Sequence, residues 1–216
     1  MSPIIAIDGP AASGKGTLSK RLAAHYGFDH LDTGSLYRAV GLMVVWAGGD
    51  PADPELARTA SAALTADSAI LCHPDLRGDD AAQAASKVAA MPEVRAALLE
   101  FQRSFAVSPP GGRGAVLDGR DIGTVVCPNA PAKLFITASV DIRAERRVKE
   151  LRQAGLEAIV QTVLEDMKAR DERDSRRAVA PLVPAIDAFV LDTSSLDADQ
   201  AFDAAVTFIR SKIGPA

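Results

Sequence analysis

The stretch IIAIDGPAASGKGTLSKRLAAHYG, residues 4–27, decides the fold of this chain. It opens with an apolar run over 4–7 that is typical of a buried strand. A glycine-rich turn follows, and then Leu18, Leu22 and Ala23 recur at helical spacing until Gly27. We therefore predict a strand, a loop and a helix over about 14–26. The loop matches G-x-x-x-x-G-K in the strand-to-helix context that such loops require.

This loop has the composition of a phosphate-binding site. A glycine-rich turn exposes successive backbone N–H groups, and the start of the following helix adds its positive end. Lys15 would place a charge on the β- and γ-phosphates of a nucleotide. Gly16 stands where Ser or Thr is usual, so Thr17 is the residue expected to reach a phosphate or a magnesium ion. The alternative is a turn that binds nothing. The predicted ATP phosphate-binding residues are Gly9, Pro10, Ala11, Ala12, Ser13, Gly14, Lys15, Gly16 and Thr17.

Four further apolar or β-branched runs predict strands, over 29–31, 115–117, 133–137 and 188–191. Helical patterns separate them, and the last one, over about 198–212, places Phe202, Val206 and Ile209 on one face. This alternation favours a five-stranded parallel sheet with helices on both faces, of the P-loop NTPase type. The three-part α/β organisation of this fold class follows from the resemblance described below.

The composition excludes several classes of protein. The chain has 216 residues, 48% hydrophobic and 24% charged, as in ordinary globular proteins. A net charge of −4 argues against a general nucleic-acid-binding protein. Two cysteines are too few for a disulfide framework, and no run is long enough for a signal peptide or a membrane span. We expect a cytoplasmic monomer that binds neither membrane nor nucleic acid.

Residues 50–90 are rich in Ala, Asp and Pro and carry little strand signal, apart from a possible strand over 69–72. We read them as an inserted, partly helical cap. The stretch SPPGGRG over 108–114 is a loop by its composition.

A second anion site is predicted by residues 165–181, EDMKARDERDSRRAVAP. An apolar stripe leads into this segment: Ile159, Val160, Val163, Leu164 and Met167. Its continuation by steps of three and four reaches Arg170, Arg173, Asp174 and Arg177. Buried arginines at this density need anions, and such cations stabilise a migrating phosphoryl group. The alternative is a solvated helix with i,i+4 ion pairs that involve Asp171 and Glu172.

Two other motifs follow predicted strands, where open α/β sheets bind their ligands. After the strand over 115–117, Asp118 is placed to organise magnesium and its waters, and Arg120 and Asp121 to face a second substrate. After the short strand over 29–31, either Thr33 or Ser35 is expected to cap the next helix. A surface turn and simple packing are the alternatives for these two motifs.

Taken together, the motifs closely resemble bacterial cytidylate kinases, a group of the nucleoside monophosphate kinases. The matching segments run in family order: IAIDGPAASGKGT, HLDTGSLYRAV, ASKVAAMPEVRAAL, LDGRDIGTVVCPNAPAKLFI and KARDERDSRRAVAPLVPA. The resemblance implies phosphorylation of CMP or dCMP by ATP with Mg²⁺. It also implies one kinase domain over 1–216. Its core covers about 1–38, 110–150 and 165–216, a monophosphate-binding region with a reduced insert covers about 39–109, and a short lid covers about 151–158.

The resemblance also assigns residues to roles. The CMP phosphate would be surrounded by Arg38, Arg95, Arg120 and Arg170. The sugar or the cytosine would be read by Thr33, Tyr37, Ser86, Asp121, Asp174 and Arg177. Transition-state charge would fall on Lys15, Arg170 and Arg173, and Mg²⁺ on Thr17 and Asp118, in part through water. These assignments come from the matching motifs, residue by residue.

No general base is implied, because a phosphate monoester oxygen is already a nucleophile. We leave His25, His30 and His73 outside the motifs and the mechanism. The insert over 64–82 is shorter than in better-known members of the family, so discrimination against UMP is expected to be weaker. Two alternatives remain open at this point: a kinase for another monophosphate or a small hydroxylated metabolite, and a nucleotide-sensing protein without turnover.

Overall fold

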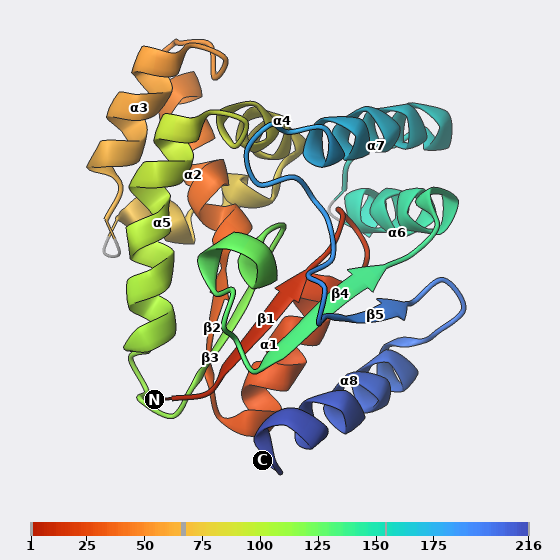
Figure 1. Ribbon diagram of the computed structural model, residues 1–216. Helices are drawn as coiled ribbons and strands as arrows, with labels where there is room; N and C mark the ends of the chain where they lie inside the picture. The colour runs from red at the N-terminus through yellow and green to blue at the C-terminus, as the bar shows by residue number, and fades with distance from the viewer. Residues whose placement is uncertain (1, 66–67, 154, 216) are drawn as a thin grey trace.

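A computed structural model describes residues 2–65, 68–153 and 155–215 (Figure 1). Five parallel strands form its sheet in the order β2-β3-β1-β4-β5. The strands are β1 (Ile4–Asp8), β2 (Asp29–Asp32), β3 (Ala115–Gly119), β4 (Ala132–Thr137) and β5 (Phe189–Asp192). All four pairings are parallel. The predicted sheet is confirmed, and every predicted strand of it lies within a residue or two of an observed one.

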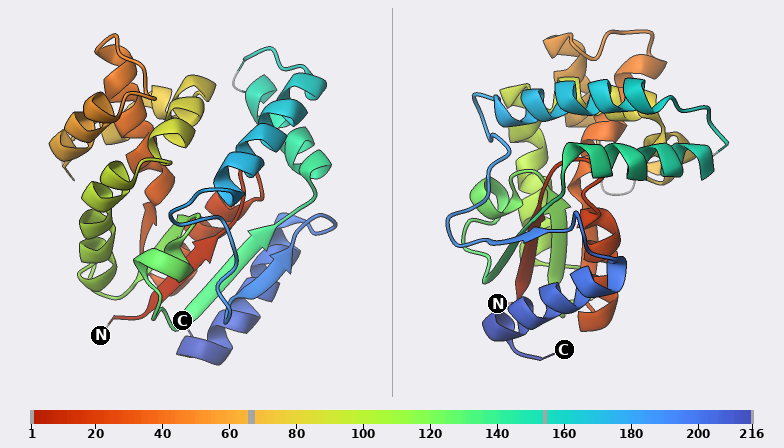
Figure 2. Two further views of the ribbon diagram at one scale, coloured as in Figure 1. Left: turned by 45° about the horizontal axis from the view of Figure 1, so that its top comes forward. Right: turned by 90° about the vertical axis from the view of Figure 1, so that its right-hand side faces the viewer.

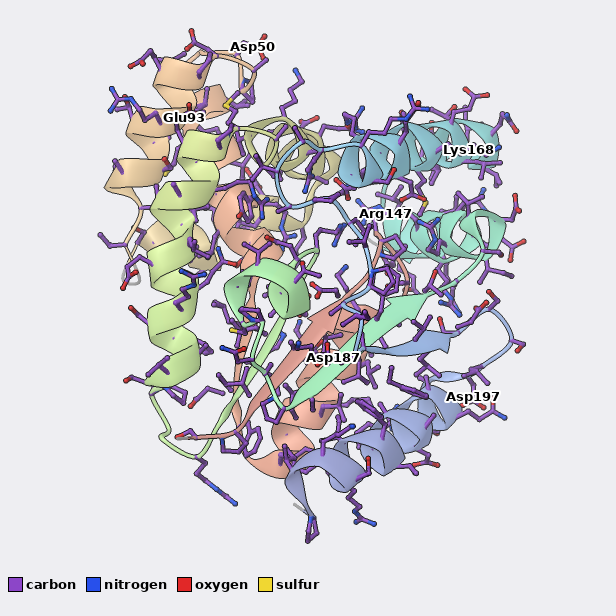
Figure 3. The ribbon with its side chains drawn as sticks, in the orientation of Figure 1. Asp50, Glu93, Arg147, Lys168, Asp187 and Asp197 are labelled. Carbon is purple, nitrogen blue, oxygen red and sulfur yellow. The ribbon has the colours of Figure 1, made fainter. Side chains whose placement is uncertain are left out.

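Helices cover both faces of the sheet. Successive side chains of a strand point to opposite faces, and both faces are apolar. Ile5 and Ile7 pack with α1 (Lys15–Tyr26) and α8 (Ala198–Ile213), whereas Ala6 packs on the other face. That other face is covered by α5 (Pro92–Val107) and by a single π-helical turn, η3 (Ile122–Val126). The start of α8 has a capping box at Asp197, which Figure 3 labels. Both predicted flanking helices are thus confirmed.

Two groups of helices rise beyond the carboxyl ends of the strands (Figure 2). The first contains α2 (Thr33–Trp46), α3 (Pro54–Ala63), α4 (Asp79–Val88) and α5, with two short 3₁₀ helices, η1 (Ala69–Cys72) and η2 (Pro74–Arg77). It encloses its own apolar core around Leu36, Val40, Val88 and Leu98. The second is a hairpin of α6 (Val140–Gln153) and α7 (Val160–Ser175). The sheet therefore presents its carboxyl edge between two helical groups.

The strand predicted over 69–72 is wrong, since these residues form η1. Ile70 and Leu71 both pack against the cluster that contains Ala39 and Leu42 of α2. Two successive residues of a strand point to opposite faces, so a strand could not place both side chains there. The helical character predicted for the insert is otherwise confirmed, while residues 66–67 of the insert lie outside the described part.

The capping prediction at the start of α2 is also wrong. The helix begins at Thr33, so the capping position is Asp32, and no side chain caps it. The Thr33 hydroxyl instead donates to the Asp118 carbonyl oxygen at 2.8 Å, and Ser35 donates to the Asp32 carbonyl oxygen at 2.6 Å. Because the Thr33 hydroxyl bonds to the end of β3, it is not available to cap the first turn of α2.

The apolar stripe that leads into the arginines of α7 is only partly buried. Met167 is buried, but Ile159 and Val160 are 71% and 47% exposed. The helix ends at Ser175, so Arg177 belongs to the segment that follows it. Among the described residues, no helix is both long enough and apolar enough to cross a membrane.

Candidate active site

The loop between β1 and α1 has the backbone of an anion-binding site. Gly9 has φ 151°, and a Cβ there would lie 2.0 Å from the Ile136 carbonyl oxygen, so only glycine fits. Ala12 and Gly14 adopt left-handed conformations, with φ 56° and 89°. Such turns direct consecutive N–H groups to one side, next to the positive end of α1. The buried Ser13 hydroxyl has no hydrogen-bond partner among the described residues.

Lys15 is held close to this loop. Its Nζ donates to the Pro10 carbonyl oxygen at 3.3 Å. Burial lowers the pKa of Lys15 to about 7, and Arg120 lowers it further, while Asp118 and Asp32 act in the opposite direction. A bound polyphosphate would favour the charged ammonium form, because opposite charges at short range stabilise each other. Lys15 therefore lies next to the loop and close to Arg120, Asp118 and Asp32, which stand at the ends of β3 and β2.

Two arginines of α6 bond to carbonyl oxygens of the phosphate loop, and the sequence interpretation missed both. Arg143 donates to the Ala11 carbonyl oxygen at 3.3 Å, and Arg146 contacts the Ser13 carbonyl oxygen at 3.4 Å. Arg146 also donates to the Thr193 carbonyl oxygen at 2.6 Å, which joins the loop to the segment after β5. The only local signal was the run RAERR over 143–147, which resembles an ordinary charged helix surface.

A network around Asp174 forms the opposite side of the site. This carboxylate is 1% exposed and accepts from Arg120 Nε at 2.8 Å and from Arg177 Nη2. Burial acts to raise the pKa of Asp174, but Arg120, Arg177 and Arg170 outweigh it and hold the pKa below its usual value. Three guanidiniums share one carboxylate, so the network keeps a surplus of positive charge.

Arg170 and Arg177 carry much of that surplus. Burial lowers the pKa of Arg170 to about 10, with Arg120 as the next contribution, and burial also lowers the pKa of Arg177. The Nε atoms of both residues are buried and have no hydrogen-bond partner among the described residues. Buried donors of this kind normally have partners, so these atoms fit an anionic ligand.

Arg95 and Asp121 form a second buried pair, which joins α5 to the segment after β3. Arg95 Nη2 donates to Asp121 Oδ2, and Nη1 donates to the Ala89 carbonyl oxygen at 3.2 Å. The guanidinium carbon of Arg95 lies 5.6 Å from the centroid of the Tyr37 ring. Burial raises the pKa of that phenol. Tyr37 and Arg95, which the resemblance assigns to the acceptor from two separate segments, therefore lie together.

Arg38 and Arg173 approach the site from α2 and α7. Arg38 Nη2 donates to Asp32 Oδ2 at 2.6 Å, and its buried Nε has no partner among the described residues. Arg173 is exposed, and its Nε lies 3.2 Å from the hydroxyl of Ser86 on α4. In this structure Arg173 thus contacts the cap, whereas Arg170 lies near Arg120 and Arg38. The role of Arg173 in stabilising transition-state charge stays a prediction.

Asp8, which the sequence interpretation also left out, joins β1 to η3. Its carboxylate accepts from the backbone N–H of Ile122 at 2.7 Å and of Gly123 at 2.8 Å. Burial raises the pKa of Asp8 to about 7, although the two backbone hydrogen bonds act to lower it. The residue fixes the turn that directly follows Asp121.

The exclusion of His30 from the motifs is wrong. Its Nε2 lies 2.7 Å from Asp118 Oδ2, because β2 and β3 are neighbours and pair Asp32 with Asp118 in register. Asp118 is buried, whereas Thr17 is exposed on the first turn of α1. Both supply hard oxygen donors that suit Mg²⁺, which usually keeps several waters. The described residues contain no group of three or more His, Cys, Asp or Glu side chains that could hold a metal ion alone.

The predicted site residues thus come from both ends of the chain and meet at one edge of the sheet. The phosphate loop, Lys15, Arg120 and Arg170 form one connected set of charges. Asp174, Arg177, Arg95, Asp121 and Tyr37 adjoin it. Ser86 borders the site through Arg173. The lid predicted over 151–158 spans the end of α6 and the connection to α7, with residue 154 outside the described part.

The chain is similar to known proteins over nearly its whole length. A family model described as cytidylate kinase matches residues 5–211. A protein named cytidylate kinase from Paramagnetospirillum magneticum is 69% identical over 212 residues, which cover 98% of this chain and 100% of that protein. Another with the same name from Rhodospirillum rubrum is 58% identical over 210 residues, covering 97% and 98% of the two chains.

Solved structures with low sequence identity share the fold. A structure titled as an unliganded sugar kinase from Janibacter sp. HTCC2649 has a TM-score of 0.53 and 14% identity, covering 99% of this chain and 97% of its own. An uncharacterized protein from Eubacterium ventriosum has a TM-score of 0.51 and 19% identity, covering 97% and 99%. These two likenesses concern the fold alone.

Proposed function

The chain belongs to the cytidylate kinase family, and from the site that it forms we propose that it transfers the terminal phosphoryl group of ATP to CMP or dCMP. The products would be ADP and CDP or dCDP, which places the chain in pyrimidine nucleotide metabolism. The observation that supports this most strongly is the pair of anion sites at one sheet edge. The loop over 9–17 suits a polyphosphate, and the guanidiniums around Asp174 suit a second phosphate.

The acceptor would lie between α2, α5 and α7. Arg38, Arg120 and Arg170 would contact its phosphate, together with Arg95. Buried donors without partners on Arg38 and Arg170 support this placement. Thr33, Tyr37, Ser86, Asp121, Asp174 and Arg177 would contact the sugar or the base, with Ser86 and Arg95 at the cytosine edge and Asp174 at the ribose.

The chemistry would be an in-line displacement. An oxygen of the CMP phosphate forms a bond to the γ-phosphorus of ATP as the bond to the β-γ bridging oxygen breaks, and ADP leaves. No proton has to be removed from the attacking oxygen, so no general base is required. Lys15, Arg170 and Arg173 would offset the charge that develops on the migrating group.

The oxygen donors of Thr17 and Asp118 fit Mg²⁺, directly or through water. When bound, the ion would supply positive charge to the phosphate oxygens of ATP. The lid over 151–158, at the tip of the α6–α7 hairpin, would close over the nucleotide and exclude water. The short insert leaves the cap small, so discrimination between CMP and UMP would rest mainly on Ser86 and Arg95.

The test is steady-state ADP formation with CMP, dCMP, UMP and AMP, each supplied as the acceptor with ATP and Mg²⁺. We expect the highest kcat/KM with CMP or dCMP. If UMP or AMP exceeds CMP tenfold in kcat/KM, the proposed acceptor is wrong. A complete absence of CMP-dependent ADP release would indicate a nucleotide-binding protein without turnover.

A pair of substitutions tests the two halves of the site separately. Lys15→Ala should lower kcat by about a hundredfold or more, because it removes a cation that acts on the transition state. Arg177→Ala should raise KM for CMP and change KM for ATP little, since Arg177 bonds to Asp174, which we place at the ribose of CMP. An equal rise in both KM values for Arg177→Ala would place this residue outside the acceptor site.

A further inference from the structure

An ion pair between the buried Arg143 and the half-buried Asp171 joins α6 to α7 next to the phosphate loop. Arg143 is 4% exposed, and its guanidinium reaches both carboxylate oxygens of Asp171. The distances are 3.1 Å from Nη1 to Oδ1 and 2.5 Å from Nη2 to Oδ2. Bidentate contacts of this kind fix the relative orientation of the two side chains as well as their separation.

The same guanidinium holds two further segments. Arg143 Nε donates to the carbonyl oxygen of Ala138, directly after β4, at 2.9 Å. Arg143 Nη1 also donates to the carbonyl oxygen of Ala11, within the phosphate loop, at 3.3 Å. One side chain therefore bonds the sheet, the phosphate loop and α7 at once.

Asp171 lies on α7 among the residues of the proposed site. It directly follows Arg170 and lies one turn before Asp174, so a rigid helix fixed at Asp171 also fixes these two residues. The other anchors of α7 reach different elements: Asp174 contacts Arg120 next to β3, and Arg173 contacts Ser86 on α4. Among the contacts recorded for the described residues, the pair of Arg143 and Asp171 is the one that connects α7 to the phosphate loop.

We propose that Arg143 and Asp171 are a positioning pair that sets the separation between the phosphates on the loop and the arginines of α7. Neither residue needs to touch a substrate for this role. Each nucleotide would still bind alone through groups that the pair does not supply, but the two would be misaligned for transfer when the pair is broken. Misplacement of reacting groups lowers turnover more than it lowers binding.

The neighbouring residue offers a matched control. Glu172 forms an ion pair with Arg176 at 2.6 Å, and both of these side chains are largely exposed. Exposed pairs contribute little, so loss of the Glu172 charge should be without effect. Glu172→Gln and Asp171→Asn remove one carboxylate each from adjacent positions of the same helix.

The experiment compares wild type, Asp171→Asn, Arg143→Lys, the double variant and Glu172→Gln. It measures kcat, both KM values, and the Kd of CMP and of a non-hydrolysable ATP analogue, each alone. We expect kcat to fall about tenfold in either single variant, with each separate Kd within about twofold of wild type. The double variant should match the single variants rather than show about a hundredfold loss, because the pair can be broken only once.

The proposal is overturned if Asp171→Asn keeps a wild-type kcat, if the losses in the double variant multiply, or if Glu172→Gln is equally impaired. It is also overturned if kcat is kept while both Kd values rise. If Arg143→Lys does not melt cooperatively, the comparison of Asp171→Asn with Glu172→Gln decides alone. The inference rests on the proposed transfer to CMP. A wild-type chain without CMP-dependent turnover would refute that function, whereas active variants would refute only the pair.

Discussion

At the scale of single residues, the ionisable groups at the sheet edge lie in surroundings that shift their pKa values in opposite directions. Burial lowers the pKa of Lys15 to about 7 and raises that of Asp8 to about 7. The same burial is outweighed at Asp174 by three guanidiniums, which keep the carboxylate charged. Groups shifted in this way cluster where a protein binds or transforms ligands.

Asp8 provides a prediction for the pH dependence of stability. Its pKa is about 7 in the folded chain, against an ordinary value of 3.8 for an aspartate, so the folded state binds the proton more tightly. The contribution of Asp8 is therefore present at low pH and is lost as pH rises through the folded pKa. From about pH 5 to about pH 8, we expect Asp8 to lower the free energy of unfolding by roughly 3 kcal/mol.

Urea unfolding of wild type and Asp8→Asn at these two pH values would measure this. The stability difference between the two proteins should favour wild type more at the lower pH, because the amide does not titrate. Asp32 and Asp174, whose pKa values are lowered, contribute in the opposite direction but equally in both proteins. A difference that stays constant with pH would contradict the buried, protonated state of Asp8.

At the scale of elements, close helix packing fixes the position of Ser86, the cap residue that we propose contacts the acceptor. A Cβ on Gly41 of α2 would lie 2.7 Å from Ala84 Cβ and 2.9 Å from the Ala84 carbonyl carbon, so the absence of a side chain lets α4 approach. Ser86 lies on α4 one turn from the Gln83 that also contacts Arg173. The separation of α2 and α4 therefore controls where Ser86 lies.

Gly41→Val should push α4 away from α2. We expect a loss of about 1–3 kcal/mol in the free energy of unfolding, which is the usual cost of overpacking. KM for CMP should rise several-fold while KM for ATP stays nearly constant, since Gly41 and Ala84 belong to the cap and not to the phosphate loop.

Val45→Ala is the matched control, because Val45 is 39% exposed on the same helix. It should leave both KM values near those of wild type. If Gly41→Val lowers stability but leaves KM for CMP unchanged, the position of α4 does not affect the acceptor.

At the scale of the whole molecule, the proposed acceptor site would be assembled from segments that are far apart in the chain. Arg95 of α5 bonds to Asp121, and Arg120 after β3 and Arg177 after α7 both bond to Asp174. In Figure 2, α5 and α7 belong to the two groups of helices on either side of the sheet edge. A ligand that bonds to all of them should stabilise both groups together.

Amide hydrogen exchange with and without CMP would test this. CMP at about a hundred times its Kd should slow exchange through site-opening motions about a hundredfold, in α5 and in α7 alike. Inorganic pyrophosphate, which suits the phosphate loop, should instead protect α1 and the residues around 9–17. Protection by CMP in only one of the two helical groups would refute an acceptor site shared between them.

Local patterns in the chain were sufficient for the sheet and the phosphate loop, whereas most residues of the candidate site were assigned through the resemblance to the cytidylate kinases. The strands were recognisable because buried parallel strands are short apolar runs. The loop was recognisable because its backbone conformation requires glycines at fixed positions. Gly9, for example, can hardly be replaced where a Cβ would meet a carbonyl oxygen of β4. The arginines of 170–177 stood out because they continued a stripe that was predicted to be buried, where such a number of cations would need anions. In the structure Arg173 is exposed and Arg177 follows α7.

The partners of these residues depended on the packing of distant segments. That Asp118 contacts His30 follows from the pairing of β2 with β3, and that Arg143 contacts Asp171 follows from the angle of the α6–α7 hairpin. The strand predicted over 69–72 failed for the same reason, since α2 offered both apolar side chains one common surface. A short segment records which chemical groups are available. Which of them meet depends on long-range packing, and so on every other part of the chain.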